Sequence, residues 1–297
     1  MRTRKLGPLE VTVVGLGCNN FGGRIDEEAT RAVVDAALAA GVTFFDTADI
    51  YGNSGGSEEL LGRVLQGRRD QIVLATKFGK EMGDGATRRG SRDYILRALE
   101  ASLHRLQTDV IDLYQHHEED PDTPLEETIG TLDELVEQGT IRAYGTSNYE
   151  PLSLERAKEI AGRGYVSEQS EYSWLTRDAE AELLPTCERL SLGFIPFFPL
   201  ASGLLTGKVT RDNPPAEGTR LHGREINAER LDKVEELRVW AEAHGVSLLD
   251  VAIGGLLAVT PVVSVIAGAT KPEQVRANAA AGAWEPTRAE LNELLSL

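Results

Sequence analysis

One helix–strand junction decides the fold of this chain: residues 27–47 read EEATRAVVDAALAAGVTFFDT. Small apolar residues recur at helical spacing over 27–40, at Ala32, Val33, Ala36, Ala37 and Ala40. Gly41 then ends the helical pattern, because glycine readily adopts the left-handed conformation that follows many helices. The apolar run 43–47 comes directly afterwards and is typical of a buried strand. The junction therefore predicts a helix that leads into a strand through a very short loop.

The same alternation of short apolar runs and longer helical patterns extends over most of the 297 residues. The predicted strands cover residues 11–15, 43–47, 72–77, 110–115, 141–145, 165–169, 193–197 and 262–266. Strands that alternate with helices form parallel sheets, and eight such units can close into a barrel. We therefore expect an α/β fold, a (β/α)8 TIM barrel, with its functional residues where the strands end.

The length of the chain fits one domain, since α/β barrels of this size fold around a single core. We expect one barrel domain over residues 1–297. The gap between the last two predicted strands is longer than the others and contains Gly203, Asn213-Pro214-Pro215 and Gly218. Such residues favour turns, so we predict a long loop or insertion at about 201–246, above the functional end of the barrel.

The composition is that of a globular, acidic protein, with 41% apolar residues and a formal net charge of −16. This charge repels phosphate backbones and anionic lipids, so it disfavours nucleic-acid and membrane-surface partners. The sequence contains neither a run of about 18 apolar residues nor a signal-peptide core, and we expect a cytoplasmic protein. Cys18 and Cys187 lack the spacing of a metal pair or a disulfide framework.

Titratable side chains gather at the ends of three predicted strands. Asp46 ends the second strand and Tyr51 follows in its loop, Lys77 ends the third, and the pair His116-His117 ends the fourth. Four titratable side chains therefore converge on one mouth of the barrel. A lysine at the end of an apolar strand needs a partner, because an isolated buried ammonium is costly. Asp46, one strand away, can supply it.

Tyr51 lies beside this predicted ion pair. A nearby ammonium favours the phenolate, so we expect the pKa of Tyr51 to lie below its usual value of about 10. Such a phenol can donate a proton near neutral pH, and a histidine on the next strand can polarise a carbonyl oxygen or relay the proton. With a hydride source alongside, these groups are suited to reducing a carbonyl.

The run His116-His117-Glu118-Glu119-Asp120 also fits a metal site, since some barrels are metal hydrolases with such ligands. Neighbouring residues on a strand face opposite ways, and no second histidine cluster lies at another strand end. We therefore predict no metal site, and we expect His116 to point away from His117.

Four motifs occur in order: Asp46-x4-Tyr51-Gly52, Thr76-Lys77, Asp112-Leu113-Tyr114-x2-His117 and Gly145-x-Ser147-Asn148. With this combination, the chain resembles the aldo-keto reductase family, which has a (β/α)8 fold and uses a nicotinamide cofactor. The resemblance extends over nearly the whole chain. It implies a catalytic tetrad of Asp46, Tyr51, Lys77 and His117, with Tyr51 as the proton donor.

The resemblance also implies where the cofactor binds. The residues that hydrogen-bond the nicotinamide carboxamide match Ser147, Asn148 and Gln169. Phe197 takes the place of a ring, commonly Tyr, that stacks on the nicotinamide. The residues that cover the pyrophosphate match Leu200, Ser202, Gly203 and Lys208. Those at the adenosine end match Gly268, Thr270, Lys271, Gln274 and Asn278.

A basic residue that is common in the family is replaced by Gln274, so Lys271 alone supplies the local positive charge. We expect NADP(H) as the cofactor, with NAD(H) as the alternative. The implied function is NADP(H)-dependent reduction of an aldehyde or ketone to an alcohol by hydride transfer. The alternative is a nicotinamide-binding regulatory or sensing subunit with little turnover, since some family members act mainly as partners of a channel.

The identity of the small-molecule carbonyl substrate depends on the loops 80–92 and 210–227. Arg88, Arg89, Arg220 and Arg224 lie in these loops and could steer an anionic substrate, although exposed arginines are more often solvated. The sequence does not fix the oligomeric state.

Overall fold

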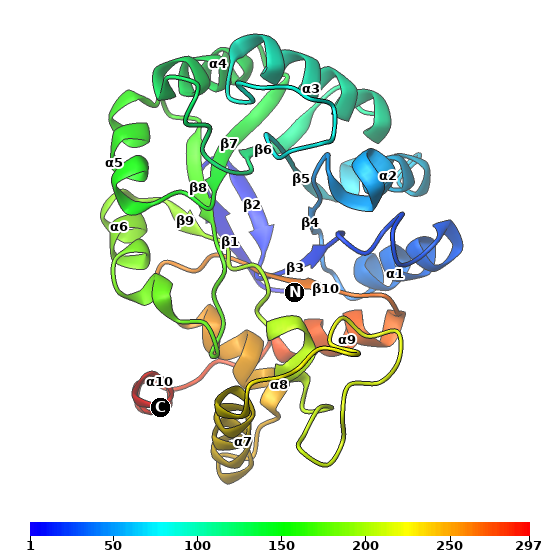
Figure 1. Ribbon diagram of the computed structural model, residues 1–297, viewed down its shortest axis with the longest axis vertical. Helices are drawn as coiled ribbons and strands as arrows, with labels where there is room; N and C mark the ends of the chain where they lie inside the picture. Colours follow the sequence, from blue (N-terminus) through cyan, green and yellow to red (C-terminus); the bar gives the residue numbers. More distant parts are fainter.

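The computed structural model describes residues 1–297 and places eight parallel strands in a ring with helices outside it (Figure 1). The strands of the ring are β3 (Val14–Gly17), β4 (Phe44–Asp46), β5 (Val73–Phe78), β6 (Ile111–His116), β7 (Ile141–Ser147), β8 (Tyr165–Gln169), β9 (Gly193–Phe194) and β10 (Val265–Gly268). Their hydrogen-bonded order is β10-β3-β4-β5-β6-β7-β8-β9. Consecutive strands of the ring thus lie side by side, which is the usual outcome of short crossover connections.

The ring closes between β9 and the residues that precede β10. Phe194 forms a parallel bridge with Val262. The amide of Phe194 donates to the carbonyl of Pro261 at 3.0 Å, and the amide of Val263 donates to the carbonyl of Phe194 at 2.9 Å. The predicted (β/α)8 TIM barrel is confirmed.

Three predicted strands differ from the structure by three residues at one end, whereas the bounds of the others agree to within two residues. The run 11–15 is divided, because Leu9–Thr12 forms β2, which pairs antiparallel with β1 (Thr3–Leu6), and β3 begins only at Val14. The run 193–197 pairs regularly only over β9, and most of the run 262–266 precedes β10. An apolar run indicates that its residues are buried. Tertiary packing decides which of these residues form backbone hydrogen bonds in a sheet, and with which strand.

The β1–β2 hairpin fills the amino-terminal end of the barrel, and Figure 1 shows it in blue within the ring of strands. Its residues Leu6, Leu9 and Val11 pack in one buried cluster with inward-facing strand residues such as Phe44 and Ala75. The interior is therefore packed at this end, and the carboxyl ends of the strands form the mouth.

The predicted helix over 27–40 is confirmed as α1 (Glu27–Ala39). The side chain of Asp26 accepts a hydrogen bond from the amide of Ala29 at 3.0 Å and so caps its first turn. The apolar side chains Val33, Val34 and Ala37 are buried against the barrel. The same arrangement recurs around the ring, where a cluster of 63 buried residues separates the strands from the helices.

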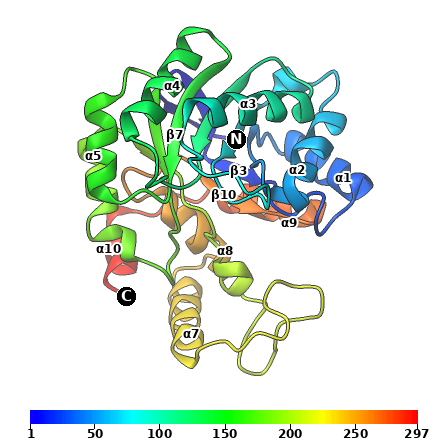
Figure 2. The same ribbon diagram turned by 45° about the horizontal axis from the view of Figure 1, so that its top comes forward.

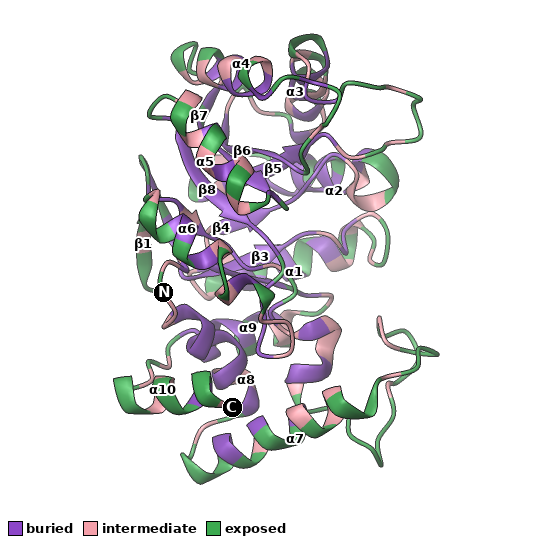
Figure 3. Ribbon diagram, turned by 60° about the vertical axis from the view of Figure 1, so that its left-hand side comes forward, coloured by how far each residue is buried: buried purple, intermediate pink, exposed green.

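Most helices cover the outside of the barrel, and Figure 3 shows buried strands behind helices with exposed outer faces. The remaining helices are α2 (Tyr51–Val64), α3 (Arg92–Leu106), α4 (Leu125–Glu137), α5 (Pro151–Ile160), α6 (Leu183–Arg189), α7 (Ala228–Ala243), α8 (Leu248–Asp250), α9 (Pro272–Ala281) and α10 (Arg288–Ser296). A π-helical turn, η4 (Val251–Gly255), continues α8. No helix combines the length and the apolar character needed to cross a bilayer.

The segment between β9 and β10 includes residues 201–246, where the sequence analysis predicts a long loop or insertion. It begins with the short helix η3 (Ala201–Thr206), continues as an irregular stretch over 207–227, and ends in α7. Figure 2 shows this irregular stretch in yellow, extending with α7 to one side of the barrel. Its residues 208–210, 213–214 and 216–221 help to line the cavity at the mouth.

Candidate active site

A cavity of about 1190 Å³ opens at the carboxyl ends of the strands. Its walls include the predicted residues Asp46, Tyr51, His117, Asn148, Gln169, Phe197, Leu200, Ser202, Gly203, Lys208, Gly268, Thr270, Lys271 and Gln274. Lys77, Ser147 and Asn278 are buried and do not line it. The structure therefore brings most of the predicted site residues to one cavity.

Strand geometry explains why polar groups face this cavity. Phe44, Ala75 and Leu113 point into the barrel and belong to its packed floor. Side chains two residues apart on a strand share a face, so Asp46 and Lys77 stand one layer above Phe44 and Ala75. β4 and β5 thus each contribute an apolar residue to the interior and then a charged residue to the mouth.

The ion pair predicted from the sequence is present. The Nζ of Lys77 lies 2.6 Å from Oδ2 of Asp46 and donates a second hydrogen bond to the carbonyl of Thr47 at 2.9 Å. Both charged side chains are almost completely buried. Burial by itself lowers the pKa of Lys77, but the attraction of Asp46 and the contact with Tyr51 together raise it above its usual value. Lys77 is therefore a fixed cation under the cavity.

The second carboxylate oxygen of Asp46 accepts hydrogen bonds from two glutamines. Oδ1 accepts from Nε2 of Gln169 at 2.9 Å and from Nε2 of Gln115 at 3.2 Å. Gln115 is not among the predicted site residues, although it lies on the inward face of β6, two residues before His117. The amide nitrogen of Gln169 is thus engaged with Asp46, and its carbonyl oxygen is the group left to bind a ligand amide.

Tyr51 begins α2 at the wall of the cavity, where the Nζ of Lys77 lies 5.2 Å from the centre of its ring. The sequence predicts a lowered pKa for this phenol, and that prediction is wrong. Burial raises the pKa of Tyr51 above its usual value, and the Asp46 carboxylate adds to this effect, whereas the charge of Lys77 only partly offsets it. Desolvation disfavours the phenolate more than one paired ammonium favours it. Tyr51 is therefore protonated at neutral pH.

His117 faces Tyr51 edge to face, with 5.9 Å between the ring centres. Burial lowers the pKa of His117 to about 2, and the nearby charges of Lys77 and Lys80 contribute. The imidazole is therefore neutral, and its buried Nδ1 has no hydrogen-bond partner. A neutral ring beside a protonated phenol is suited to holding a carbonyl oxygen.

His116 points away from the cavity, as strand alternation predicts. Its ring stacks on Phe78 with 4.9 Å between centres, and its Nδ1 lies 2.8 Å from the hydroxyl of Tyr149. Among the described residues 1–297, no group of three His, Cys, Asp or Glu side chains is placed to hold a metal ion.

A strained turn follows β7. Asn148 has a φ of 59°, which is the left-handed region that few residues other than glycine adopt. Its Nδ2 donates to the carbonyl of His117 and to Oγ of Ser147, both at 3.0 Å. Asn148 thereby presents its side-chain oxygen to the cavity, whereas Ser147 lies behind it.

Glu168, which the sequence analysis does not single out, supports this turn from behind. Its buried carboxylate accepts hydrogen bonds from Oγ1 of Thr146 and Oγ of Ser170, both at 2.6 Å, and from the amide of Tyr149 at 3.3 Å. Burial raises the pKa of Glu168 to about 7, and these hydrogen bonds oppose that rise. The only sequence signal for this role is a charged residue in an otherwise buried strand, directly before Gln169 and therefore on the opposite face of β8.

The segment after β9 supplies the outer wall of the cavity. Three consecutive residues have positive φ angles, namely Ala201 at 46°, Ser202 at 60° and Gly203 at 110°. Successive amides in such turns can converge on an anion, and Lys208 lies on the same wall. This wall therefore carries the donors that a diphosphate needs.

The start of α9 forms the far end of the cavity. Oε1 of Gln274 accepts hydrogen bonds from the amide of Thr270 at 2.7 Å and the amide of Lys271 at 3.1 Å, so it caps the helix. Lys271 is exposed at the cavity and makes no ion pair. Asn278 is only 6% exposed and is not among the residues that line the cavity, so its cofactor contact stays a prediction. One helical turn places it behind Gln274, where packing of α9 buries it.

These features fit a nicotinamide dinucleotide together with a substrate. The cavity of about 1190 Å³ exceeds the range of roughly 300–1,000 Å³ that single small ligands occupy. His117 Nδ1 and Oδ1 of Asn19 are buried polar atoms without partners, and both residues line the cavity. Lys208 and Lys271 supply cations at the wall and the far end. The amide oxygens of Asn148 and Gln169 lie near the tetrad, where a nicotinamide would bind. Lys208 and Lys271 lie on the parts of the cavity wall where the phosphates would bind.

The profile of the Aldo/keto reductase family matches residues 13–297. The chain belongs to this family. It is 34% identical to the probable aldo-keto reductase 1 of Glycine max, over 98% of this chain and 87% of that protein. It is 35% identical to a probable voltage-gated potassium channel subunit beta of Oryza sativa subsp. japonica, over 87% of this chain and 83% of that protein.

A solved structure, the aldo-keto reductase AKR11C1 from Bacillus halodurans in its holo form, matches with a TM-score of 0.84 and 36% identity, over 100% of this chain and 95% of that one. This aldo-keto reductase is accordingly an NAD(P)H-dependent oxidoreductase that uses a nicotinamide cofactor on a small-molecule carbonyl substrate.

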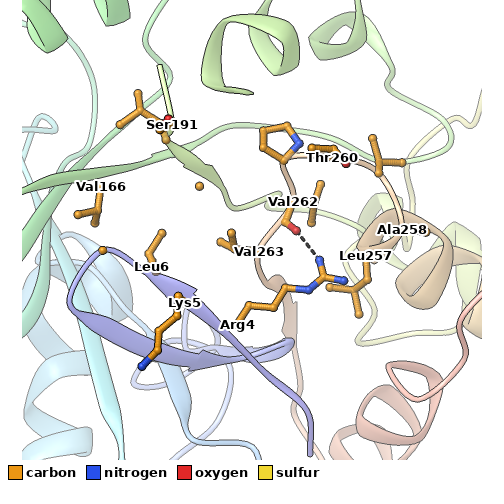
Figure 4. A pocket seen from close by; sticks show the side chains of 15 residues that line it. Arg4, Lys5, Leu6, Val166, Ser191, Leu257, Ala258, Thr260, Val262 and Val263 are labelled. Carbon is orange, nitrogen blue, oxygen red and sulfur yellow. Dashed lines mark hydrogen bonds between the residues drawn. The ribbon is translucent and has the colours of Figure 1, made fainter. Parts of the chain in front are cut away.

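The aldo-keto reductase has a second cavity, of about 470 Å³, at the opposite end of the barrel (Figure 4). It lies between the β1–β2 hairpin and residues 257–263, and it contains none of the predicted site residues. The only hydrogen bond drawn in it joins Nη1 of Arg4 to the carbonyl of Val262 at 2.5 Å. Polar groups with free hydrogen-bonding capacity therefore converge at the mouth and not at this end.

Proposed function

We propose that this protein reduces an aldehyde or ketone to an alcohol, with Tyr51 as the proton donor and NADP(H) as the cofactor. This proposal rests on the position of the Tyr51 ring. Its centre lies 5.2 Å from Nζ of Lys77 and 5.9 Å from the centre of the His117 ring. When bound, the nicotinamide supplies a hydride to the carbonyl carbon. Tyr51 supplies the proton to the oxygen, so that the carbonyl becomes an alcohol.

The raised pKa of Tyr51 suits a proton donor. The phenol is protonated when the substrate binds, and negative charge then develops on the substrate oxygen. Once Tyr51 has released its proton, the resulting phenolate is stabilised by the neighbouring ammonium of Lys77, which Asp46 holds in place. The neutral ring of His117 orients the carbonyl oxygen towards the phenol.

The turn at Asn148 and the amide of Gln169 orient the nicotinamide. Nδ2 of Asn148 and Nε2 of Gln169 are engaged in the protein. Their free oxygens can accept from the amide of a carboxamide, which fixes which face of the ring points to Tyr51. Phe197, on the same cavity wall, supplies an aromatic surface for stacking.

The preference for NADP(H) over NAD(H) rests on Lys271. Its ammonium is exposed at the far end of the cavity and makes no ion pair, so it can contact a phosphate on the adenosine ribose. Gln274 cannot add to this charge, and its oxygen caps α9. We also place the protein in the cytoplasm, which is in keeping with two buried free cysteines, Cys18 and Cys187.

The decisive experiment is Tyr51→Phe, assayed by NADPH oxidation with a panel of aldehydes. We expect kcat to fall by about 10³-fold, the scale of general acid catalysis, while the Kd for NADPH changes less than twofold. Tyr114→Phe is the matched control, because the hydroxyl of Tyr114 is buried, unpartnered and remote from the cavity. A loss of NADPH binding as large as the loss of rate would show instead that Tyr51 holds the cofactor.

The similarity to the rice channel subunit keeps a second function under consideration, that of a nicotinamide-binding regulatory or sensing subunit with little turnover. Purified protein that binds NADPH but reduces none of the aldehydes would favour this second function. In that case Tyr51→Phe would also change no measured property.

A further inference from the structure

Polar residues also lie behind the site, on the outer side of the neighbouring strands β6, β7 and β8. His116 directly precedes His117, and Glu168 directly precedes Gln169. Successive side chains of a strand face opposite ways, so His116 and Glu168 lie behind the strands while their neighbours face the cavity. His116 is 1% exposed and Glu168 is 0% exposed. Neither has a role in the function proposed above.

Tyr149, the residue after Asn148, joins these two side chains. Its amide donates to Oε1 of Glu168 at 3.3 Å, and its hydroxyl lies 2.8 Å from Nδ1 of His116. Tyr149 is itself buried. We call His116, Tyr149 and Glu168 the outer network. It extends from β6 through the turn after β7 to β8.

Glu168 is a buried carboxylate that no cation accompanies. Its three donors are Oγ of Ser170, Oγ1 of Thr146 and the amide of Tyr149. Burial raises its pKa to about 7. A buried carboxylate without a cation is costly, and groups of this kind concentrate at functional sites. A role beyond packing is therefore expected for Glu168, because an apolar side chain of similar size would fill the same space.

The structure around His116 is shaped to hold its ring. One face of the imidazole stacks on Phe78, with 4.9 Å between the ring centres. Gly79, with a φ of 107°, lies so close that a Cβ there would be 2.7 Å from Cδ2 of His116. Burial lowers the pKa of His116 to about 4, so the ring is neutral. Its one hydrogen-bond partner is the hydroxyl of Tyr149.

The outer network encloses the strained residue Asn148. A left-handed asparagine persists only where its surroundings hold it in place. On the cavity side, Nδ2 of Asn148 donates to the carbonyl of His117 at 3.0 Å. The amide of Asn148 donates to the carbonyl of Gln169 at 3.1 Å. On the outer side, Tyr149 is fixed at both its amide and its hydroxyl. The turn is therefore held from both sides of the sheet.

We propose that His116, Tyr149 and Glu168 are positioning residues that hold Asn148 in its left-handed turn and thereby orient the nicotinamide of the cofactor. The inference rests on the proposed function, in which the side-chain oxygen of Asn148 accepts from the carboxamide. None of the three residues lines the cavity, so they act through Asn148 and not by contact with the cofactor. The outer network should therefore affect binding of the nicotinamide and leave binding of the rest of the cofactor unchanged.

The test compares two ligands by titration calorimetry: NADPH and 2′-phospho-ADP-ribose, which lacks the nicotinamide. Glu168→Leu leaves the amide of Tyr149 without its acceptor. We expect the Kd for NADPH to rise about tenfold, the scale of one buried polar group left unpaired, and the Kd for 2′-phospho-ADP-ribose to change less than about twofold. Equal weakening of both ligands would overturn the inference, because Glu168 would then maintain the whole cavity.

Glu168→Gln is the conservative variant for this position. The side-chain oxygen of a glutamine can still accept from the amide of Tyr149, and its nitrogen can donate to Oγ1 of Thr146. The Kd for NADPH should therefore stay within about threefold of the wild-type value. A loss as large as that of Glu168→Leu would contradict a role based on these hydrogen bonds.

The bond between His116 and Tyr149 is tested by smaller changes. Tyr149→Phe removes the hydroxyl and keeps the amide that binds Glu168. We expect the Kd for NADPH to rise about threefold, again without a change for 2′-phospho-ADP-ribose. His116→Leu should weaken NADPH at least as much, and His116→Asn should restore part of the affinity, since its amide can reach the same hydroxyl. Tyr149→Phe should then have no further effect in the His116→Leu variant, because both changes break the same bond.

Tyr144→Phe is the matched control for Tyr149→Phe. It removes another hydroxyl of a buried tyrosine on β7, which donates to Oδ1 of Asp133 at 2.9 Å, away from the turn at Asn148. Neither Kd should change. Independent, additive effects of His116→Leu and Tyr149→Phe would overturn the inference, since the two residues would then not act through one bond. A lack of turnover with every aldehyde would reject the proposed reduction instead, and the two binding constants would still decide the role of the outer network.

Discussion

At the floor of the barrel, Leu6 and Leu9 of the hairpin pack against Phe44 and Ala75, whereas two residues further along the same strands Asp46 and Lys77 form a buried ion pair. The two layers share strands, direction and inward orientation, and they differ in chemistry. The floor can be filled by the hairpin, because apolar side chains need no specific partner. The mouth cannot be filled in this way, because each polar group there must find a partner or bind a ligand. Residues that stabilise the fold and residues that form the site are thus only two positions apart on the same strand.

The cavities at the two ends show the same contrast. The cavity at the floor contains one partly buried cation, Arg4, whose Nη1 is already bonded to the carbonyl of Val262. The cavity at the mouth contains unpartnered atoms of His117 and Asn19 and two arginines that share Asn20. The presence of a cavity therefore does not identify a site in this protein. Polar groups that converge without partners identify it.

The largest difference between the two layers is expected when the cation at the mouth, Lys77, is removed. Lys77→Met should lower kcat by about 10³-fold or more, because the Tyr51 phenolate loses its stabilising charge. It should also destabilise the fold by about 3–5 kcal/mol, since Asp46 remains as a buried carboxylate without a cation. Steady-state kinetics and urea unfolding measure the two effects. In the double variant with Asp46→Asn, stability should largely return while activity stays lost.

Lys158→Met is the control for this variant. Lys158 is half-buried and donates to the carbonyl of Tyr165 at 3.3 Å, away from the mouth. Its loss should leave kcat within twofold. A similar loss of activity in both lysine variants would mean that Lys77 acts through general stability and not through the site.

A change at the floor should have the opposite pattern. Leu6→Ala should cost about 2–5 kcal/mol of unfolding free energy, because it removes a buried side chain from a packed layer. At temperatures where the variant is folded, kcat and KM should match the wild type. Leu152→Ala, on a residue that is 67% exposed, should cost little by the same unfolding assay. A large change of kcat in Leu6→Ala would contradict the separation of the two layers.

Within the mouth, Lys271 distinguishes the two nicotinamide cofactors. Lys271→Ala should weaken NADPH binding roughly tenfold, in line with the loss of a charge-assisted hydrogen bond worth about 1.5 kcal/mol. The Kd for NADH should change less than twofold. Arg276→Ala, on an exposed arginine of α9 outside the cavity, controls for a general loss of positive charge. Equal weakening of both cofactors by Lys271→Ala would show that Lys271 does not contact the additional phosphate.

The smallest expected effect is that of pH on reduction. Reduction needs the protonated phenol, and the pKa of Tyr51 lies above its usual value of 10.0, so the acid form is retained through neutral pH. The pKa of His117 is about 2, so its charge does not change between pH 6 and 9 either. The rate of reduction should therefore vary less than about twofold over this range and fall only at more alkaline pH. A fall centred near pH 7 or 8 would show that Lys77 outweighs burial after all.

The ends of the predicted strands, together with the motifs of the family, were sufficient to predict that Asp46, Lys77 and His117 lie at one mouth of the barrel. The pKa of Tyr51 could not be predicted in this way. Its sign depends on how far the surrounding loops remove the phenol from water, and the sequence analysis considered only the neighbouring charge. The burial of Asn278 could not be predicted either, since the position of α9 decides it.

The sequence by itself determined the barrel, the order of its strands and the polar groups at their ends, because these follow from local periodicity and from motifs within single βα units. The tertiary structure alone decided how the first predicted strand divides between hairpin and barrel, why Tyr51 keeps its proton, and that Arg24 and Arg220 share Asn20. Each of these depends on residues that are distant in the chain and on how much water they exclude from one another. Burial and long-range contact are properties of the folded molecule, and a periodic pattern records only that some residues will be buried.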